Sequence, residues 1–137
     1  MKEYAISLKQ PWAALLANGL KTIEVRRWPT ARRGRVLIHA ARVSDPRPEA
    51  WAHVPPHLAA MARLTGGILG TGEITDCRAY ASRAAFVAEH AAHLNDPSWF
   101  QPGLYGFTFV HLTVLPFRAF PGWLRFFAVA DEPAVRT

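Results

Sequence analysis

The stretch Gly19-Leu20-Lys21-Thr22-Ile23-Glu24-Val25-Arg26 decides how the rest of this chain is interpreted. Its glycine follows apolar residues at helical spacing and is a typical helix stop, so Lys21 lies in the connection to a strand. From residue 22 onward polar and apolar side chains alternate, which predicts a half-buried strand. Same-face neighbours on a strand are about 6.5–7 Å apart, so Thr22, Glu24 and Arg26 form a polar row that Lys21 can join.

Positive charge is concentrated in the same part of the chain. The chain has 16 basic and 10 acidic side chains and a formal net charge of +6, and residues 21–42 hold seven basic residues against one acid, Glu24. This stretch therefore carries as much net charge as the whole chain, which is typical of a polyanion-binding protein. The pattern also fits a solvated arginine-rich surface with an ordinary Glu24–Arg26 ion pair.

The whole sequence predicts one α+β domain. With 137 residues, half of them hydrophobic, the chain suits one core and is short for two. A small mixed β-barrel of about five to six strands with flanking helices fits the predicted order better than a doubly wound sheet, which needs regular crossover helices. We expect strands at 4–8, 22–28, 35–41, 66–75, 105–115 and 124–130, helices at 11–18 and 82–94, two short helices within 45–64, and a C-terminal tail at 131–137.

The glycines of segment 66–75 stand at positions 66, 67, 70 and 72. This spacing matches neither a Walker loop nor the dinucleotide fingerprint, and no long amphipathic helix follows it directly. Glycines in a tightly curved strand explain the segment better than a phosphate-binding loop.

Several function classes are excluded or disfavoured by composition. Cys77 is the single cysteine of the chain, which excludes an intramolecular disulfide and a cysteine-rich zinc site. The pair His90 and His93 has no evident third ligand, so we expect no metal, and we expect no cofactor. No run of 18 apolar residues and no signal-peptide pattern occurs, so we expect a cytoplasmic protein with no membrane partner. We also expect a monomer.

Three segments together resemble the ASCH domain family. The Gly-x-Lys-x-x-Glu-x-Arg core quoted above is the family's hallmark, and the resemblance is dense over residues 4–42. It implies a single domain over residues 1–130, with a β-barrel related to the RNA-binding PUA domains. The segments that carry it are Ile6-Ser7-Leu8-Lys9-Gln10-Pro11-Trp12-Ala13, then Gly19 through Arg27-Trp28-Pro29-Thr30, then Arg33-Gly34 and Ile38-His39-Ala40-Ala41.

The resemblance implies a cleft between barrel and flanking helix, lined by the family motif, for RNA, DNA or a nucleotide-sized ligand. Lys21 and Arg26 suit a phosphate, and Glu24 can accept a hydrogen bond from an exocyclic amine. A tryptophan offers a stacking face for a base. The candidate ligand-binding residues are Lys21, Glu24, Arg26, Trp12, Trp28, His39, Arg27 and Arg33.

Two of the candidates, and the aromatic C-terminal segment, also fit structural roles. Trp12 shares helical spacing with Leu15 and Leu16, which also fits the core, and His39 in an apolar strand also fits a structural histidine. The C-terminal segment with Trp123, Phe126 and Phe127 fits closure of the barrel core, or alternatively docking of a partner protein.

One branch of the ASCH family deacetylates acetylated cytidine, and this resemblance implies a catalytic role for Lys21. That branch has a threonine at the position of Glu24 and an assisting glutamate later in the chain. A carboxylate beside a lysine raises its pKa and favours a charged anchor over a base. If the chain is an enzyme, Lys21, Thr22 and Glu24 are the catalytic candidates, with Glu73 or Glu89 as the late carboxylate.

Overall fold

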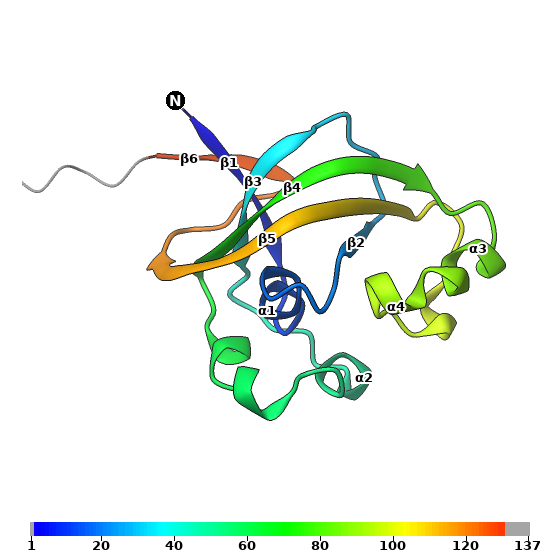
Figure 1. Cartoon of the computed structure of the whole chain (residues 1–137), viewed down its shortest axis with the longest axis horizontal. Coiled ribbons are helices and arrows are strands. Elements are labelled where there is room, and N and C mark those ends of the chain that lie inside the picture. The colour runs from blue at the N-terminus through cyan, green and yellow to red at the C-terminus, as the bar shows by residue number, and fades with distance from the viewer. Residues whose placement is uncertain (1, 131–137) are drawn as a thin grey trace, which may run out of the picture.

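A six-stranded mixed sheet forms the centre of the computed structural model, which describes residues 2–130 (Figure 1). The predicted tail at 131–137 lies outside the described residues. The strands are β1 (Glu3–Leu8), β2 (Ile23–Arg26), β3 (Gly34–Ala40), β4 (Gly67–Ala79), β5 (Tyr105–Ala119) and β6 (Phe126–Val129), in the sheet order β2-β5-β4-β3-β1-β6. The pair of β1 and β3 is parallel, and the other four pairs are antiparallel.

Strand pairing leaves the sheet open within residues 2–130, so the predicted barrel is not closed by backbone hydrogen bonds. The two edges are β2 and β6, each four residues long, and the pairing of β6 with β1 runs only as far as Ile6. Side chains span the remaining gap. The Arg26 Nη2 atom donates to the Ser7 carbonyl at 2.6 Å, and the Trp28 ring packs edge-on against Phe126. The α+β class is confirmed, and the sheet is an open one bridged by side chains.

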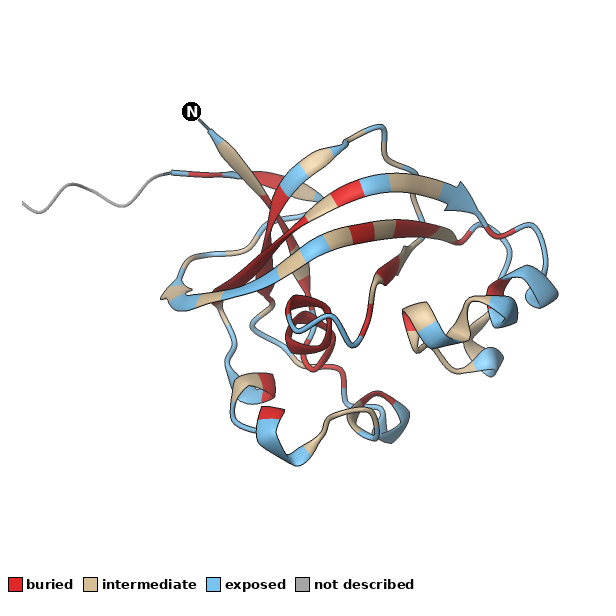
Figure 2. Ribbon diagram, viewed as in Figure 1, coloured by how far each residue is buried: buried red, intermediate tan, exposed pale blue. Residues whose placement is uncertain are grey.

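Helix α1 (Trp12–Ala17) is buried along its whole length, as Figure 2 shows, because the sheet and the short helical turns surround it. Its alanines allow a close approach to β4. A Cβ atom at Gly70 would lie 2.7 Å from the Ala17 Cβ and 2.9 Å from the Thr113 carbonyl oxygen. The glycine-rich segment is therefore a strand packed closely against its neighbours, as the sequence predicted.

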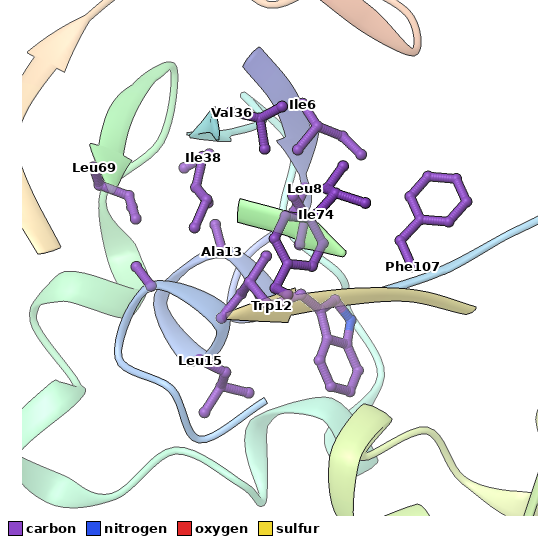
Figure 3. Packing of buried hydrophobic residues seen from close by; sticks show 14 of the residues in the cluster. Ile6, Leu8, Trp12, Ala13, Leu15, Val36, Ile38, Leu69, Ile74 and Phe107 are labelled. Atoms are coloured by element: carbon purple, nitrogen blue, oxygen red, sulfur yellow. The ribbon is translucent and has the colours of Figure 1, made fainter. Parts of the chain in front are cut away.

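The main hydrophobic core lies between α1 and the sheet (Figure 3). Apolar side chains from β1, β3, β4 and β5 converge on the helix, which is the expected arrangement of a helix layered on a curved sheet. Its labelled members include Ile6, Leu8, Val36, Ile38, Leu69, Ile74 and Phe107.

The remaining helices are short and surround α1 and one end of the long strands (Figure 1). The segment predicted as one helix at 82–94 is two. Ser82 caps the first by accepting a hydrogen bond from the Ala85 amide at 3.1 Å, as expected of an N-cap serine. No helix within residues 2–130 has the length and apolar character needed to cross a membrane. The elements are α2 (Pro48–Trp51), α3 (Arg83–Ala88), α4 (His90–His93) and the 3-10 turns Pro56–Leu58, Met61–Arg63 and Pro97–Trp99.

The contact between Gly70 and Ala17 leads to the first prediction. Gly70→Ala forces two Cβ atoms together in a packed interior and should lower the free energy of unfolding by about 1–3 kcal/mol in urea denaturation. Ala17→Gly alone costs about 1 kcal/mol as a glycine within a helix. The double variant should lose less than the sum of the two single losses, because the Cβ collision is gone. If the loss in the double variant equals the sum of the two single losses, the predicted contact between residues 70 and 17 is contradicted.

Candidate functional site

The Lys21 side chain is fully buried at the junction between α1 and β2. Its Nζ atom donates to the His93 carbonyl at 2.9 Å, lies 3.3 Å from the Glu24 Oε1 atom, and is 5.0 Å from the centre of the Trp12 ring. The backbone amide of Thr22 donates to the Ala92 carbonyl at 2.8 Å, which ties this junction to α4. The ammonium therefore has protein partners from β2, α4 and α1.

The pKa of Lys21 is lowered, and burial is the main cause. The charge of Glu24 and its hydrogen bond raise the pKa of Lys21, while the nearby Arg26 lowers it. The sequence correctly predicted that Glu24 raises the pKa of Lys21. It did not predict that burial outweighs this effect, because burial of the ammonium was not visible in the sequence.

Glu24 joins Lys21 to Arg26 across the polar face of β2. Its Oε2 atom accepts from the Arg26 Nε at 2.9 Å, and Arg26 continues to the Ser7 carbonyl of β1. Val25 packs with the cluster around Phe86, as expected of an apolar side chain on this strand. With Lys21 and Glu24 only 0% and 8% exposed, the row is not an ordinary surface ion pair. Removing one member of such a pair is costly because a buried charge is left behind.

A cleft of about 550 Å³ opens beside this row. Its wall is formed by the end of β1 and by β2, by the segment after β3 and by the loop before β6. Six basic and two acidic side chains line it, so its charge is predominantly positive. The lining residues are Ser7, Lys9, Trp12, Lys21, Glu24, Val25, Arg26, Arg27, Ala41, Asp45, Arg47, Asn95, Trp123, Leu124 and Arg125.

Asp45 is the second carboxylate of the cleft, and the sequence analysis missed it. Its Oδ2 atom accepts from the Trp12 indole nitrogen at 2.9 Å, and the Arg47 guanidinium donates to both carboxylate oxygens. Burial by itself raises the pKa of Asp45, but the hydrogen bonds from Arg47 and Trp12 outweigh it and lower the pKa to about 2. Trp12 is thus both a core residue and a cleft residue, which reconciles the two interpretations left open by its spacing.

The sequence also missed Lys9, Arg47, Trp123 and Arg125 as cleft residues. They come from three separate loops or strand ends, and no periodic pattern connects them. A usable signal existed at Asp45-Pro46-Arg47, where an acid and an arginine flank a proline in the segment that follows the buried strand β3.

Several predicted ligand-binding residues lie outside the cleft lining. Trp28 packs edge-on against Phe107 and Phe126. Arg33 is exposed and donates to the carbonyls of residues 30 and 32. His39 lies at the bottom of a neighbouring hollow with both ring nitrogens engaged, by the Ser7 hydroxyl and the Phe120 carbonyl, as expected of a structural histidine.

The catalytic candidates are only partly brought together. Lys21 and Glu24 are in contact, whereas Thr22 does not line the cleft. Neither late carboxylate lines it: Glu73 is hydrogen-bonded to His111 at 2.5 Å, and Glu89 lies 3.3 Å from an arginine of β4. Within residues 2–130 no group of three or more histidine, cysteine or acidic side chains is placed to hold a metal ion.

His93 supports the buried lysine from α4. Its carbonyl accepts from Lys21, its Nε2 atom contacts the Phe86 carbonyl at 2.6 Å, and its Nδ1 atom accepts from the Asn95 amide at 2.9 Å. Since a carbonyl can only accept, the Nε2 atom carries the proton and the ring is neutral. Burial lowers the pKa of His93 to about 4.

Comparisons with known proteins identify the family and the fold. A family model described as the ASCH domain matches residues 6–115. Activating signal cointegrator 1 from Homo sapiens and from Mus musculus are each 46% identical to this chain over 46 residues. These matches cover 34% of this chain but only 8% of each relative, so the chain corresponds to a small part of those proteins.

Solved structures from Zymomonas mobilis share the fold. The crystal structure of its ASCH protein has a TM-score of 0.64 at 15% identity, covering 95% of this chain and 89% of that one. A tyrosine-to-phenylalanine mutant of the same protein has a TM-score of 0.67 at 13% identity, covering 96% and 92%. At this level of identity the similarity concerns the fold alone.

The lowered pKa of His93 predicts a pH dependence of stability. Between its ordinary pKa of 6.5 and its folded value of about 4, the unfolded chain binds the proton more readily than the folded one. The free energy of unfolding should therefore fall as the pH drops through this window. Urea denaturation at about pH 7 and about pH 4.5 measures the loss. It should be smaller in His93→Gln, whose amide does not titrate, than in the exposed control His57→Gln. Equal losses in the two variants would contradict the assignment.

Proposed function

Because the chain belongs to the ASCH domain family, we propose that its cleft binds nucleic acid, with single-stranded RNA as the first candidate ligand. The observation that carries the proposal is the composition of the cleft, which places six basic side chains around a hollow of about 550 Å³. This volume lies within the range of about 300–1,000 Å³ that is usual for a pocket holding a small ligand. A base with its sugar and phosphate is a ligand of that size.

The proposal separates the floor of the cleft from its rim. On the floor, Lys21, Glu24 and Arg26 bind one another, so their charges serve first to hold the site together. On the rim, Lys9 and Arg27 are exposed and suit contacts to phosphate oxygens. Glu24 provides carboxylate oxygens beside the floor that can accept from an exocyclic amine of a base, whereas the oxygens of Asp45 are already engaged by Trp12 and Arg47.

Charge removal at the rim tests this proposal. Lys9→Ala/Arg27→Ala should weaken the binding of a short fluorescein-labelled single-stranded RNA roughly ten- to hundredfold and should reduce the salt slope by about 1–2. Fluorescence polarisation at several salt concentrations measures both quantities, with single-stranded DNA and duplex RNA as competitors.

The matched control removes two charges elsewhere on the surface. Arg63 and Arg83 are exposed and lie outside the cleft lining, so Arg63→Ala/Arg83→Ala has the same net charge as the rim variant. Its affinity should stay close to that of the unaltered protein. Equal weakening in both double variants would mean that binding follows total charge and not the cleft.

A second candidate function is hydrolysis of acetylated cytidine to cytidine and acetate. One observation favours it: the amine of Lys21 borders the cleft, and burial lowers its pKa, as a lysine base or nucleophile requires. In the family branch that deacetylates acetylated cytidine, a glutamate later in the chain assists the lysine. Glu73 and Glu89 lie outside the cleft lining, so neither is placed for that role here.

The hydrolase candidate predicts acetate release from acetylated cytidine, measured by chromatography of the nucleoside product. Lys21→Met keeps the length of the side chain and removes its amine, so turnover should be lost. Arg63→Ala, which removes an exposed charge outside the cleft lining, should retain turnover. Thermal melting of each variant separates lost chemistry from lost folding. If the unaltered protein shows no turnover, the hydrolase candidate is contradicted and only the binding function remains.

A further inference from the structure

The loop between β5 and β6 separates the basic cleft from a second hollow. This hollow has a volume of about 500 Å³, and its wall is mainly apolar. It shares Ser7, Lys9, Ala41, Trp123 and Leu124 with the cleft, so the two form one continuous surface on either side of the loop. Any chain-like ligand that leaves the cleft past Lys9 meets this hollow next.

Two large apolar side chains on the loop are turned to solvent. Trp123 is 76% and Leu124 is 82% exposed, and Val43 across the hollow is 68% exposed. Adjoining exposed apolar side chains are typical of a binding surface. For the segment with Trp123, Phe126 and Phe127 the sequence favoured closure of the core and left docking of a partner as the alternative. Phe126 and Phe127 pack against the core, whereas Trp123 lies outside it.

The backbone holds the loop in this arrangement. Arg125 has a φ of 53°, in the left-handed region that a residue with a side chain adopts at a cost of roughly 1–2 kcal/mol. The Arg125 guanidinium also lies 5.0 Å from the centre of the Trp28 ring, which anchors the end of the loop to the core. Such local strain persists where the surrounding structure fixes it, and it is frequent at ligand-binding sites.

The charges around the hollow limit what can occupy it. Lys9 and Arg42 flank its apolar wall, and its lining residues in the described part of the chain include no acidic side chain. The occupant should therefore combine a flat apolar group with negative charge. A nucleobase joined to its phosphates has this combination, and an indole ring is a good stacking platform for any base.

We propose that the hollow beside Trp123 binds the base of the nucleotide adjacent to the one in the cleft. The inference rests on the proposed nucleic-acid function and makes it more specific. The ligand is then a single strand of at least two nucleotides, because a base inside a duplex is already stacked on its neighbours and cannot lie on the indole ring. A free nucleoside would occupy the cleft alone.

The test compares Trp123→Ala with Trp123→Phe and with a control variant on α3. Trp123→Ala should weaken the binding of the labelled single-stranded RNA roughly ten- to hundredfold while leaving its salt slope as it is, because no charge is lost. Trp123→Phe should recover much of the affinity. The gain in affinity from a mononucleotide to a dinucleotide, measured by calorimetry, should shrink in Trp123→Ala. Val87→Ala, an exposed apolar position on α3 outside both hollows, is the control and should bind normally.

The possible failures can be told apart. If the unaltered protein binds the RNA and Trp123→Ala binds it equally well, the second subsite is refuted and the cleft proposal stands. If the unaltered protein binds no RNA of any length, both proposals are refuted. If gel filtration shows a dimer that Trp123→Ala converts to a monomer, the hollow is covered by a second copy of the chain, and the base-binding inference is refuted.

Discussion

The rest of the structure depends on the burial of one ammonium group. Lys21 contacts the Glu24 carboxylate on β2, the His93 carbonyl on α4 and the Trp12 ring on α1. Glu24 also accepts a hydrogen bond from Arg26, and Arg26 donates to a carbonyl of β1 across the open edge of the sheet. A charge withdrawn from water needs partners on all sides, so this row fixes the relative positions of the helix, the edge strand and the α3–α4 segment at once.

The row also explains how a basic protein keeps a well-formed cleft. If the floor cations had no internal partners, their mutual repulsion in a poorly solvated site would oppose folding. Glu24 holds two neighbouring cations in place, and Asp45 holds Arg47 and orients Trp12. The exposed rim can then carry positive charge at little cost, because water solvates it. The family motif therefore serves the architecture of the site as well as its chemistry.

Local chemistry was readable from the sequence where neighbours along the chain decide the outcome. The alternation around Glu24, the N-cap at Ser82 and the strand character of the glycine-rich segment were all predicted. Strand boundaries that depend on pairing with another strand were not predicted. Strand β4 continues through Asp76 to Ala79 because β5 pairs with it along that length, and such tertiary pairing overrides the weak strand propensity of polar residues.

The sequence by itself determined the family, the α+β class, the polar row of β2 and the concentration of positive charge near it. Only the tertiary structure decided that Lys21 is buried, that Asp45 belongs to the site, and that Trp123 faces solvent. The physical reason is distance along the chain. The carbonyl that accepts the hydrogen bond from Lys21 lies 72 residues away, and burial, hydrogen-bond partners and pKa all depend on such remote neighbours, which no local pattern encodes.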